Sequence, residues 1–138
     1  MMKKLCFAVA VAAGMMMNVS CSTTPAMVDL GGEWKVVTFG GEAVSDTVRT
    51  RPFVVFNTAD STYHVHTGIN RMNGGFHVTG RTLTFGPGAM TMAAGSPDAM
   101  RMERVIVGHM QQPLTVALKR DTLNLSVAGG NVVLQLVK

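Results

Sequence analysis

Apolar and polar residues alternate through most of the chain after Leu30. The alternation is clearest near the C-terminus, where three segments repeat it: Leu114/Val116/Leu118, Leu123/Leu125/Val127 and Val132/Leu134/Leu136. In a strand, every second side chain lies on the same face, so each segment is expected to bury one face of a strand. Turn residues at 119–121 and 128–131 separate the three segments. The pattern predicts an antiparallel sheet that is covered on one side only.

More strands are predicted upstream, where β-branched and aromatic residues lie between Gly, Asn and Asp. They cover residues 33–39, 53–56, 62–67, 76–78 and 82–85. The segment 53–56 is wholly apolar, whereas the others alternate. Together with the three C-terminal segments, they give about eight strands.

One helix is predicted between these strands, from Ser96 to about Gln112. Ser96 suits the N-cap, Pro97 suits the first helical position, and the charge of Asp98 favours the start of a helix. One arc of this helix carries Ala99, Met102, Val105, Ile106, His109 and Met110. An apolar arc of this kind can cover the apolar side of the sheet. The predicted fold is therefore α+β, a curved antiparallel sheet or half β-barrel of about eight strands packed against one helix.

The first 20 residues are predicted to be a signal peptide. Lys3 and Lys4 precede an apolar run at 5–13, which is too short to span a bilayer, and Cys21 follows. This arrangement resembles a bacterial lipoprotein signal, although Asn18 occupies the position where an aliphatic residue is usual. The resemblance implies that Cys21 is lipidated and anchors the protein to a membrane. The alternative is an ordinary secretory leader that leaves Cys21 as a free thiol. Residues 21–28 are expected to form a flexible tether, and residues 29–138 the folded domain.

Length and composition limit the function classes that remain. The sequence has 138 residues, enough for one domain. Two of its twelve basic residues lie in the predicted signal peptide, and the other ten nearly balance the eight acidic residues. Such a balance does not favour binding to nucleic acid. Cys6 also lies in the signal peptide, so the exported chain holds Cys21 alone and an intramolecular disulfide is not expected.

Three short motifs together resemble the META-domain family. They are Leu-Gly-Gly-Glu-Trp at 30–34, Gly-Ile-Asn-Arg-Met-Asn-Gly-Gly-Phe at 68–76, and Thr-Met-Ala-Ala at 91–94, which precedes the helix that bears Met102 and Glu103. The resemblance implies a cracked or half β-barrel with one helix. Bacterial members include a heat-shock-induced envelope protein and many lipoproteins. Many relatives have cysteines where this chain has Ile69 and the pair 94–95, so a cross-link or metal pair at these positions is not expected.

The segment 68–75 is expected to be a compact loop, with Asn70, Arg71, Asn73 and Gly74 as its characteristic residues. Gly68, Gly74 and Gly75 are interpreted as permitting positive φ, and the two asparagines tolerate it while bonding nearby backbone. In one interpretation, Asn70 and Arg71 bond backbone carbonyls and seal one end of the sheet. In the other, the loop binds a ligand and Arg71 contacts an anion or carboxylate. Glu103 is expected to pair with Arg71 or another basic group.

Metal binding is not predicted. His64 and His66 lie on one face of a strand, but a hairpin symmetric about Arg71 would place His77 opposite Val65, on the other face. His64 and His66 are therefore expected to face solvent. Six methionines lie between positions 72 and 110, and Met102 and Met110 fall on the packing arc of the helix, where core filling is the ordinary role.

No cofactor and no enzymatic activity are expected, because common nucleophile, phosphate-binding and zinc motifs are absent. Two function hypotheses remain. The first is a stress-related envelope lipoprotein, in the outer membrane facing the periplasm, that binds proteins or acts in quality control through a strand edge or a Met100/Val107 patch. The second is a binder of a lipid or other apolar ligand in a concavity lined by Phe53, Val55, Phe85 and Met90. An internal cavity would favour the second hypothesis, and a filled core the first.

Overall fold

The computed structural model describes residues 28–138, so the predicted signal peptide, Cys21 and most of the predicted tether lie outside the described residues. In these residues the structure has nine strands and one helix. The strands are β1 (Gly32–Phe39), β2 (Glu42–Ala43), β3 (Phe53–Asn57), β4 (Thr62–His66), β5 (Arg71–Thr79), β6 (Thr82–Met90), β7 (Leu114–Lys119), β8 (Thr122–Ser126) and β9 (Val132–Val137). The helix, α1, spans Pro97–Met110 between β6 and β7.

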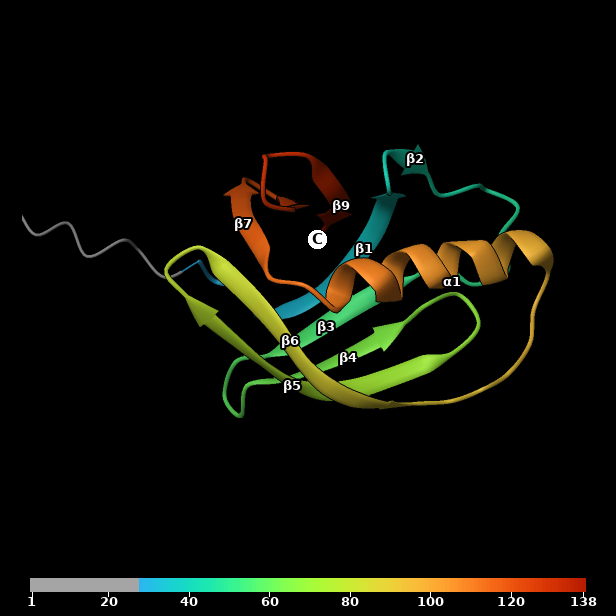
Figure 1. Cartoon of the computed structure of the whole chain (residues 1–138), viewed down its shortest axis with the longest axis horizontal. Coiled ribbons are helices and arrows are strands. Elements are labelled where there is room, and N and C mark those ends of the chain that lie inside the picture. Colours follow the sequence, from blue (N-terminus) through green and yellow to red (C-terminus); the bar gives the residue numbers. More distant parts are fainter. Residues whose placement is uncertain (1–27) are drawn as a thin grey trace, which may run out of the picture.

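All nine strands belong to one antiparallel sheet, in the order β2-β1-β3-β4-β5-β6-β7-β8-β9, and β1 also pairs with β9. β6 and β7 pair at Thr82↔Thr115 and Leu83↔Leu114 and then diverge (Figure 1). Because only two residue pairs join β6 to β7, the described sheet is strongly curved but not fully closed as a barrel. This confirms the predicted α+β class. The additional strand is β2, which has two residues.

The concave side of the sheet is filled by side chains. Alternate residues of every long strand point inward, and α1 lies across this side, where it contacts β1 and β9 (Figure 1). The largest fully buried side chains include Trp34, Phe56, Ile106 and Leu134. Trp34 also donates its ring N–H to the carbonyl of Leu30, at 2.7 Å. Apolar burial on this scale is the main source of stability in a domain of this size.

Four aromatic rings pack together within this core. Phe56 contacts Phe76 edge to face and stacks against Phe85, with ring centroids 5.1 and 5.9 Å apart. Tyr63 meets Phe85 edge to face at 5.0 Å. Edge-to-face and offset rings at these distances add to the stabilisation that burial alone provides. The aromatic cluster fills the space between β3, β4, β5 and β6.

The predicted lining of the concavity is wrong for two of its four residues. Phe85 is buried and Met90 is partly buried, but Phe53 and Val55 lie on the outer face, while Val54 and Phe56 point inward. The reason is that segment 53–56 is apolar at every position, so its sequence does not show which alternate residues face the core.

The helix begins as predicted and ends two residues earlier than expected. The hydroxyl of Ser96 accepts a hydrogen bond from the backbone N–H of Ala99, at 3.3 Å, and Pro97 follows the cap. The buried residues of the helix are Met102, Glu103, Ile106 and Met110. On the exposed side, Arg101 donates to both carboxylate oxygens of Glu42, at 3.0 and 2.7 Å, and so joins α1 to β2.

The hairpin of β4 and β5 turns earlier than predicted. His66 pairs with Arg71 and Val65 with Met72, so the turn consists of residues 67–70 instead of being centred on Arg71. Arg71 to Gly75 are therefore strand residues, not loop residues. His77 is not opposite Val65 as predicted, because β5 pairs with β4 only through residues 71–75. The partner of His77 is Thr84, on β6. The physical reason is that Gly68, with φ of +102°, supplies the positive φ that the turn requires.

Candidate functional site

Thr67 and Asn70 close the tight turn between β4 and β5. The backbone N–H of Thr67 donates to the carbonyl of Asn70, at 2.9 Å, and the N–H of Asn70 donates to the Thr67 hydroxyl, at 3.0 Å. Both residues are buried, although they belong to a turn. Thr67 is not among the residues predicted for this site, although its position just before a turn glycine is typical of a hydroxyl that bonds the following backbone.

A buried carboxylate from the helix meets this turn. Asn70 donates its side-chain N–H groups to both oxygens of Glu103, at 3.1 and 2.9 Å, and the Thr67 hydroxyl donates to one of them at 2.5 Å. Glu103 is 7% exposed, so these donors replace the water that the carboxylate loses on folding. Within residues 28–138, every buried side-chain nitrogen or oxygen has a hydrogen-bond partner.

The predicted pairing of Glu103 with Arg71 or another basic group is wrong. The ion pairs among the described residues join Arg51 to Asp46 and Arg101 to Glu42. Arg71 is the first residue of β5 and its side chain is exposed on the outer face. The sequence did contain a signal for burial of Glu103, because this residue precedes Met110 by about two helical turns and so shares its face.

Asn70 also holds the segment that leads into the helix. Its side-chain oxygen accepts from the backbone N–H of Ala93, at 2.7 Å, and from the hydroxyl of Thr91, at 3.0 Å. Its side-chain nitrogen donates to the carbonyl of Ala93, at 3.0 Å. Thr91 in turn accepts from the backbone N–H of Arg71, at 3.0 Å. Asn70 thus bonds main-chain groups, as the first of the two loop interpretations predicts, whereas the side chain of Arg71 takes no part.

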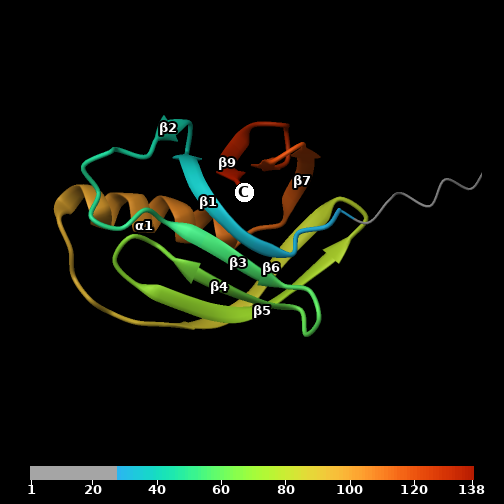
Figure 2. The same cartoon turned by 180° about the vertical axis from the view of Figure 1, so that it is seen from behind.

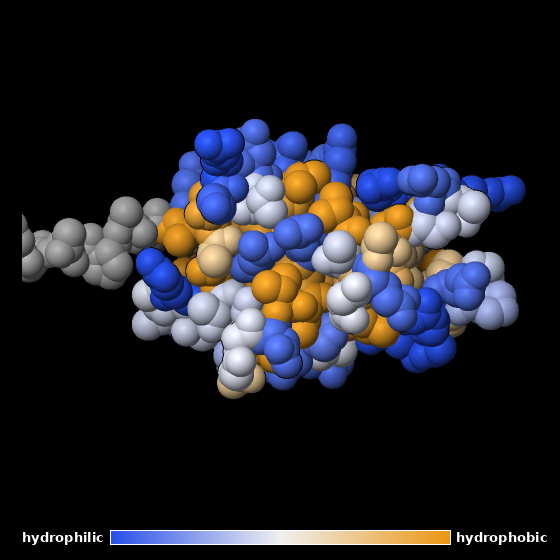
Figure 3. Space-filling view, turned by 90° about the horizontal axis from the view of Figure 1, so that it is seen from above, coloured by the Kyte–Doolittle hydropathy of each residue, from blue (hydrophilic) through white to orange (hydrophobic). Residues whose placement is uncertain are grey.

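A cleft of about 610 Å³ lies beside this buried network. Its walls are the loop between β2 and β3, the turn 67–70, the segment 91–96 and the first turn of α1. Apolar lining comes from Val48, Ile69, Ala99 and Met102, and polar lining from Ser45, Thr47, Arg49, Ser96 and Asp98. In Figure 3 the right-hand end of the molecule is notched between two lobes of mainly hydrophilic residues.

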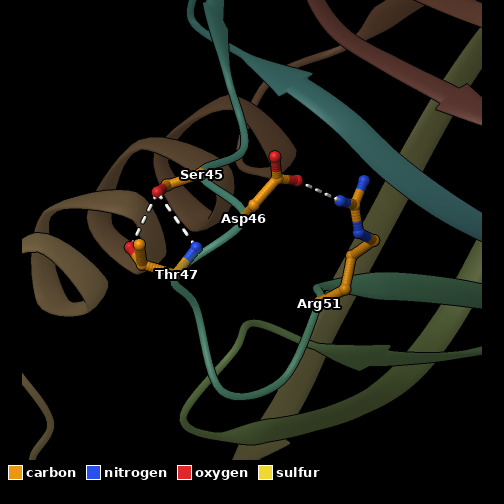
Figure 4. A network of polar contacts seen from close by, with 4 residues as sticks. All are labelled: Ser45, Asp46, Thr47 and Arg51. Atoms are coloured by element: carbon orange, nitrogen blue, oxygen red, sulfur yellow. Dashed lines mark hydrogen bonds and ion pairs between the residues drawn. The ribbon is translucent and has the colours of Figure 1, made fainter.

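The loop that forms one wall of the cleft is ordered by its own hydrogen bonds (Figure 4). The Ser45 and Thr47 hydroxyls are 2.7 Å apart, and the backbone N–H of Thr47 donates to Ser45 at 3.2 Å. Arg51 forms an ion pair with Asp46 at 3.4 Å. These local bonds give the wall a defined shape, although an exposed ion pair adds little stability.

A family model, the META domain, matches residues 26–138. The chain belongs to the META domain family. The match includes the turn, the segment 91–96 and the helix that form the buried network, and it confirms the family that the sequence resembles.

Solved structures share the fold of this META domain. An NMR structure of a protein is 20% identical, with a TM-score of 0.62 over 77% of this chain and 87% of the other. An NMR structure of a protein from Burkholderia xenovorans is 14% identical, with a TM-score of 0.61 over 77% and 80%. A crystal structure of a DUF4847 family protein from Bacteroides vulgatus is 16% identical, with a TM-score of 0.55 over 78% and 92%. The comparison with curated proteins found no match.

The outer face of the META domain carries the other predicted loop residues. Arg71 and Asn73 project there beside His66 and His64, their partners on β4. His64 and Asn73 are joined through ring nitrogen Nδ1 and oxygen Oδ1. Both histidines lie on the outer face and are half-buried there, whereas Tyr63 and Val65 are buried. The predicted orientation of this strand is therefore correct.

The hydrogen bond that the ring of His66 accepts determines whether this ring can bind a metal ion. Its Nδ1 accepts the backbone N–H of Gly68, at 3.0 Å, so the neutral ring carries its proton on Nε2 and offers no lone pair there. Burial lowers the pKa of His66, and the nearby Arg71 and His64 lower it further. Among residues 28–138, no three His, Cys, Asp or Glu side chains gather closely enough to hold a metal ion.

Gly74 has a different role from the predicted one. Its backbone is not in the positive-φ region, and neither is that of Gly75, so the expected conformational role is wrong for both and correct for Gly68 alone. Gly74 lies opposite Gly88 of β6, and Tyr63 crosses this pair to donate its hydroxyl to the carbonyl of Gly86, at 3.0 Å. A Cβ on Gly74 would lie 2.8 Å from both the Tyr63 ring and the carbonyl oxygen of Pro87. Gly74 therefore makes room for a buried tyrosine, whose pKa is raised by burial.

The methionines divide between core and surface. Met102 and Met110 are buried in the core, as predicted from the helical arc, and Met72 pairs with Met90 across β5 and β6. Met92, by contrast, is 89% exposed just beyond the end of β6. No helix in the described part of the chain combines the length and the apolar character that crossing a membrane requires.

Proposed function

We propose that this META domain protein is a non-enzymatic, stress-related lipoprotein of the cell envelope that binds another protein, in an interaction or quality-control role. The observation that carries the proposal is the contrast between a filled interior and an ordered cleft on the surface. Trp34 and Phe56 are 1% and 2% exposed and occupy the space where an apolar ligand would lie. This filled core favours protein binding over the alternative of a lipid bound in the concavity.

The cleft has the mixed chemistry of a protein-binding recess. Val48, Ile69 and Ala99 offer apolar contacts, while Arg49, Asp98 and hydroxyl groups surround them. An apolar centre with polar groups around it is the usual composition of a surface that binds another protein. The network of Thr67, Asn70 and Glu103 fixes the turn on one side of the cleft, so little ordering is required on binding.

The environment of the acidic and hydroxyl groups supports a non-enzymatic role. Glu103 is buried and already accepts from Thr67 and Asn70, so it is poorly placed to take a proton from a substrate. Ser96 caps the helix, and Ser45 is bonded to Thr47. The hydroxyls of Ser45, Thr47 and Ser96 are thus engaged in local structure instead of being activated by a neighbouring base.

Site-specific photo-crosslinking in cells tests the proposed binding. The full chain would carry a photoreactive amino acid at Val48, which lines the cleft, or at Lys119, an exposed control position on β7. We expect discrete protein adducts from position 48, more abundant after heat shock, and none from position 119. Absence of protein adducts at position 48, or equal adducts at both positions, would contradict the proposal.

Attachment to the membrane through Cys21 is tested separately. We expect the full chain to incorporate an alkyne-labelled fatty acid, and Cys21→Ser to remove the label. We also expect globomycin to cause accumulation of the unprocessed precursor. An unlabelled full chain, processed normally in globomycin, would instead support an ordinary secretory leader.

A further inference from the structure

Four side chains form a row across the outer face of four neighbouring strands. Lys35 of β1 lies opposite Phe53 of β3, which lies opposite His66 of β4, which in turn lies opposite Arg71 of β5. Directly opposite residues of antiparallel strands point to the same face. Figure 2 looks onto this face, with α1 behind the strands. We name these four residues the basic row.

The two ends of the basic row carry exposed positive charges. Lys35 and Arg71 are exposed, and among residues 28–138 neither has a carboxylate within ion-pair distance. Glu33 lies on the same face of β1, in the neighbouring row with His64. Unpaired cations at both ends attract an anionic partner, and they do so more strongly at low ionic strength.

The centre of the basic row is aromatic. The rings of Phe53 and His66 are stacked, with centroids 5.6 Å apart and planes 23° apart, and His64 lies 6.2 Å from Phe53. Phe53 is half-buried, so part of its ring is open to a partner. A ring that is exposed beside polar groups suits contact with an apolar or aromatic side chain.

The length of the row specifies the spacing of its ligand. Three strand-to-strand steps of about 4.8 Å separate Lys35 from Arg71, a span of about 14 Å. An extended peptide rises about 3.4 Å per residue and places residues i, i+2 and i+4 on one side, so the four steps from i to i+4 also cover about 14 Å. A segment of this kind would place its end side chains on Lys35 and Arg71 and its middle side chain between the rings of Phe53 and His66.

We infer that the basic row binds an extended segment of a partner protein that has acidic residues at positions i and i+4 and an apolar or aromatic residue at i+2. This inference rests on the proposed protein-binding function and adds a second surface to it. The row ends at Arg71, just beyond the turn whose residues Gly68 and Ile69 line the cleft. One partner could therefore contact both surfaces across the turn.

A peptide with this spacing provides the direct test. The probe is fluorescein-labelled Glu-Ser-Phe-Ser-Glu, capped at its C-terminus, and its anisotropy is measured against the purified full chain in non-ionic detergent. We expect saturable binding that weakens in 0.5 M salt. The control peptides are Lys-Ser-Phe-Ser-Lys, which should not bind, and Glu-Glu-Phe-Ser-Ser, which has the same composition with the wrong spacing and should bind more weakly.

Protein variants locate the binding. Lys35→Ala and Arg71→Ala should each weaken binding about threefold, the size expected for an exposed ion pair. Lys119→Ala and Arg104→Ala are the matched controls and should leave it unchanged. Arg71→Glu should restore affinity for a peptide in which one terminal Glu is replaced by Lys, an outcome that a misfolded variant cannot produce.

Two results would overturn the inference. One is unchanged binding after the double substitution Lys35→Ala and Arg71→Ala, and the other is equal affinity for the peptide with the wrong spacing. Cross-linking at Val48 reports on the cleft independently. Protein adducts at Val48 without peptide binding would overturn the basic row and leave the proposed function standing, whereas loss of both would overturn both.

Discussion

Asn70 donates to both oxygens of the buried Glu103 carboxylate, and this contact fastens the turn between β4 and β5 to helix α1. The same amide group bonds the backbone of Ala93 through its oxygen and its nitrogen. One side chain therefore holds together three of the four segments that form the cleft. The shape of the candidate site therefore depends on Asn70, although this residue does not itself line the cleft.

Replacement of Asn70 by alanine should destabilise the protein strongly. The Glu103 carboxylate would lose two donors without gaining water, which costs about 3 kcal/mol of unfolding free energy. Asn73→Ala, at the exposed asparagine three residues later, is the control and should change the unfolding free energy by no more than about 0.5 kcal/mol. Urea unfolding measures both. Equal losses for the two variants would contradict a special role of Asn70.

Two adjacent glycines should respond differently to the same change. In Gly74→Ala, the new methyl group would lie 2.8 Å from Tyr63 and from the carbonyl of Pro87. Overpacking of this kind costs about 2 kcal/mol. In Gly75→Ala, the nearest atom is the carbonyl oxygen of Ser61 at 3.6 Å, an ordinary contact, so stability should change little. If thermal unfolding showed the same loss for both variants, the packing role of Gly74 would be wrong.

Stability should fall in mildly acidic solution because of His66. Burial lowers the pKa of this side chain below its ordinary value of 6.5, and Arg71 and His64 lower it further. The unfolded chain therefore takes up the proton at a higher pH than the folded chain, so the unfolding free energy decreases as the pH falls from 6.5 through the lowered pKa. Protonation also removes the Nδ1 acceptor used by Gly68.

Two histidine variants separate this effect from general acid sensitivity. His66→Ala should flatten the dependence of unfolding free energy on pH below 6.5. His77→Ala changes an exposed histidine on β5. This variant should show the same dependence of unfolding free energy on pH as the unmodified protein. An unchanged slope in His66→Ala would show that another group causes the loss of stability.

The strands and the helix could be predicted because their signals are local. Alternation at 114–118, 123–127 and 132–136 corresponds to three strands, and Ser96 caps the helix as its sequence predicts. The predicted inward face is wrong at two strand ends, because Leu118 and Val132 are exposed and Val133 is buried instead of Val132. Segment 53–56 lacks alternation, and its inward face could not be assigned. Local patterns therefore predicted the elements, but not the orientation of a strand that is apolar throughout.

The buried network could be predicted only in part, because its partners are distant in the sequence. The sequence singles out both Asn70 and Glu103, but it predicts that Glu103 pairs with Arg71 or another basic group, since a carboxylate is usually expected beside a cation. Glu103 instead accepts from Thr67 and Asn70, which the tight turn brings to α1. Gly74 was misinterpreted for a related reason, because nothing in its neighbouring sequence shows that Tyr63 crosses it.

Native mass spectrometry tests most directly whether the interior is filled by side chains. The sample is the purified full chain, which is released from detergent in the gas phase. We predict the mass of one processed chain with its covalent modification and no further small molecule. An additional lipid or other apolar molecule, bound in stoichiometric amount and lost only when the chain unfolds, would contradict a filled interior. That result would favour the apolar-ligand hypothesis over protein binding.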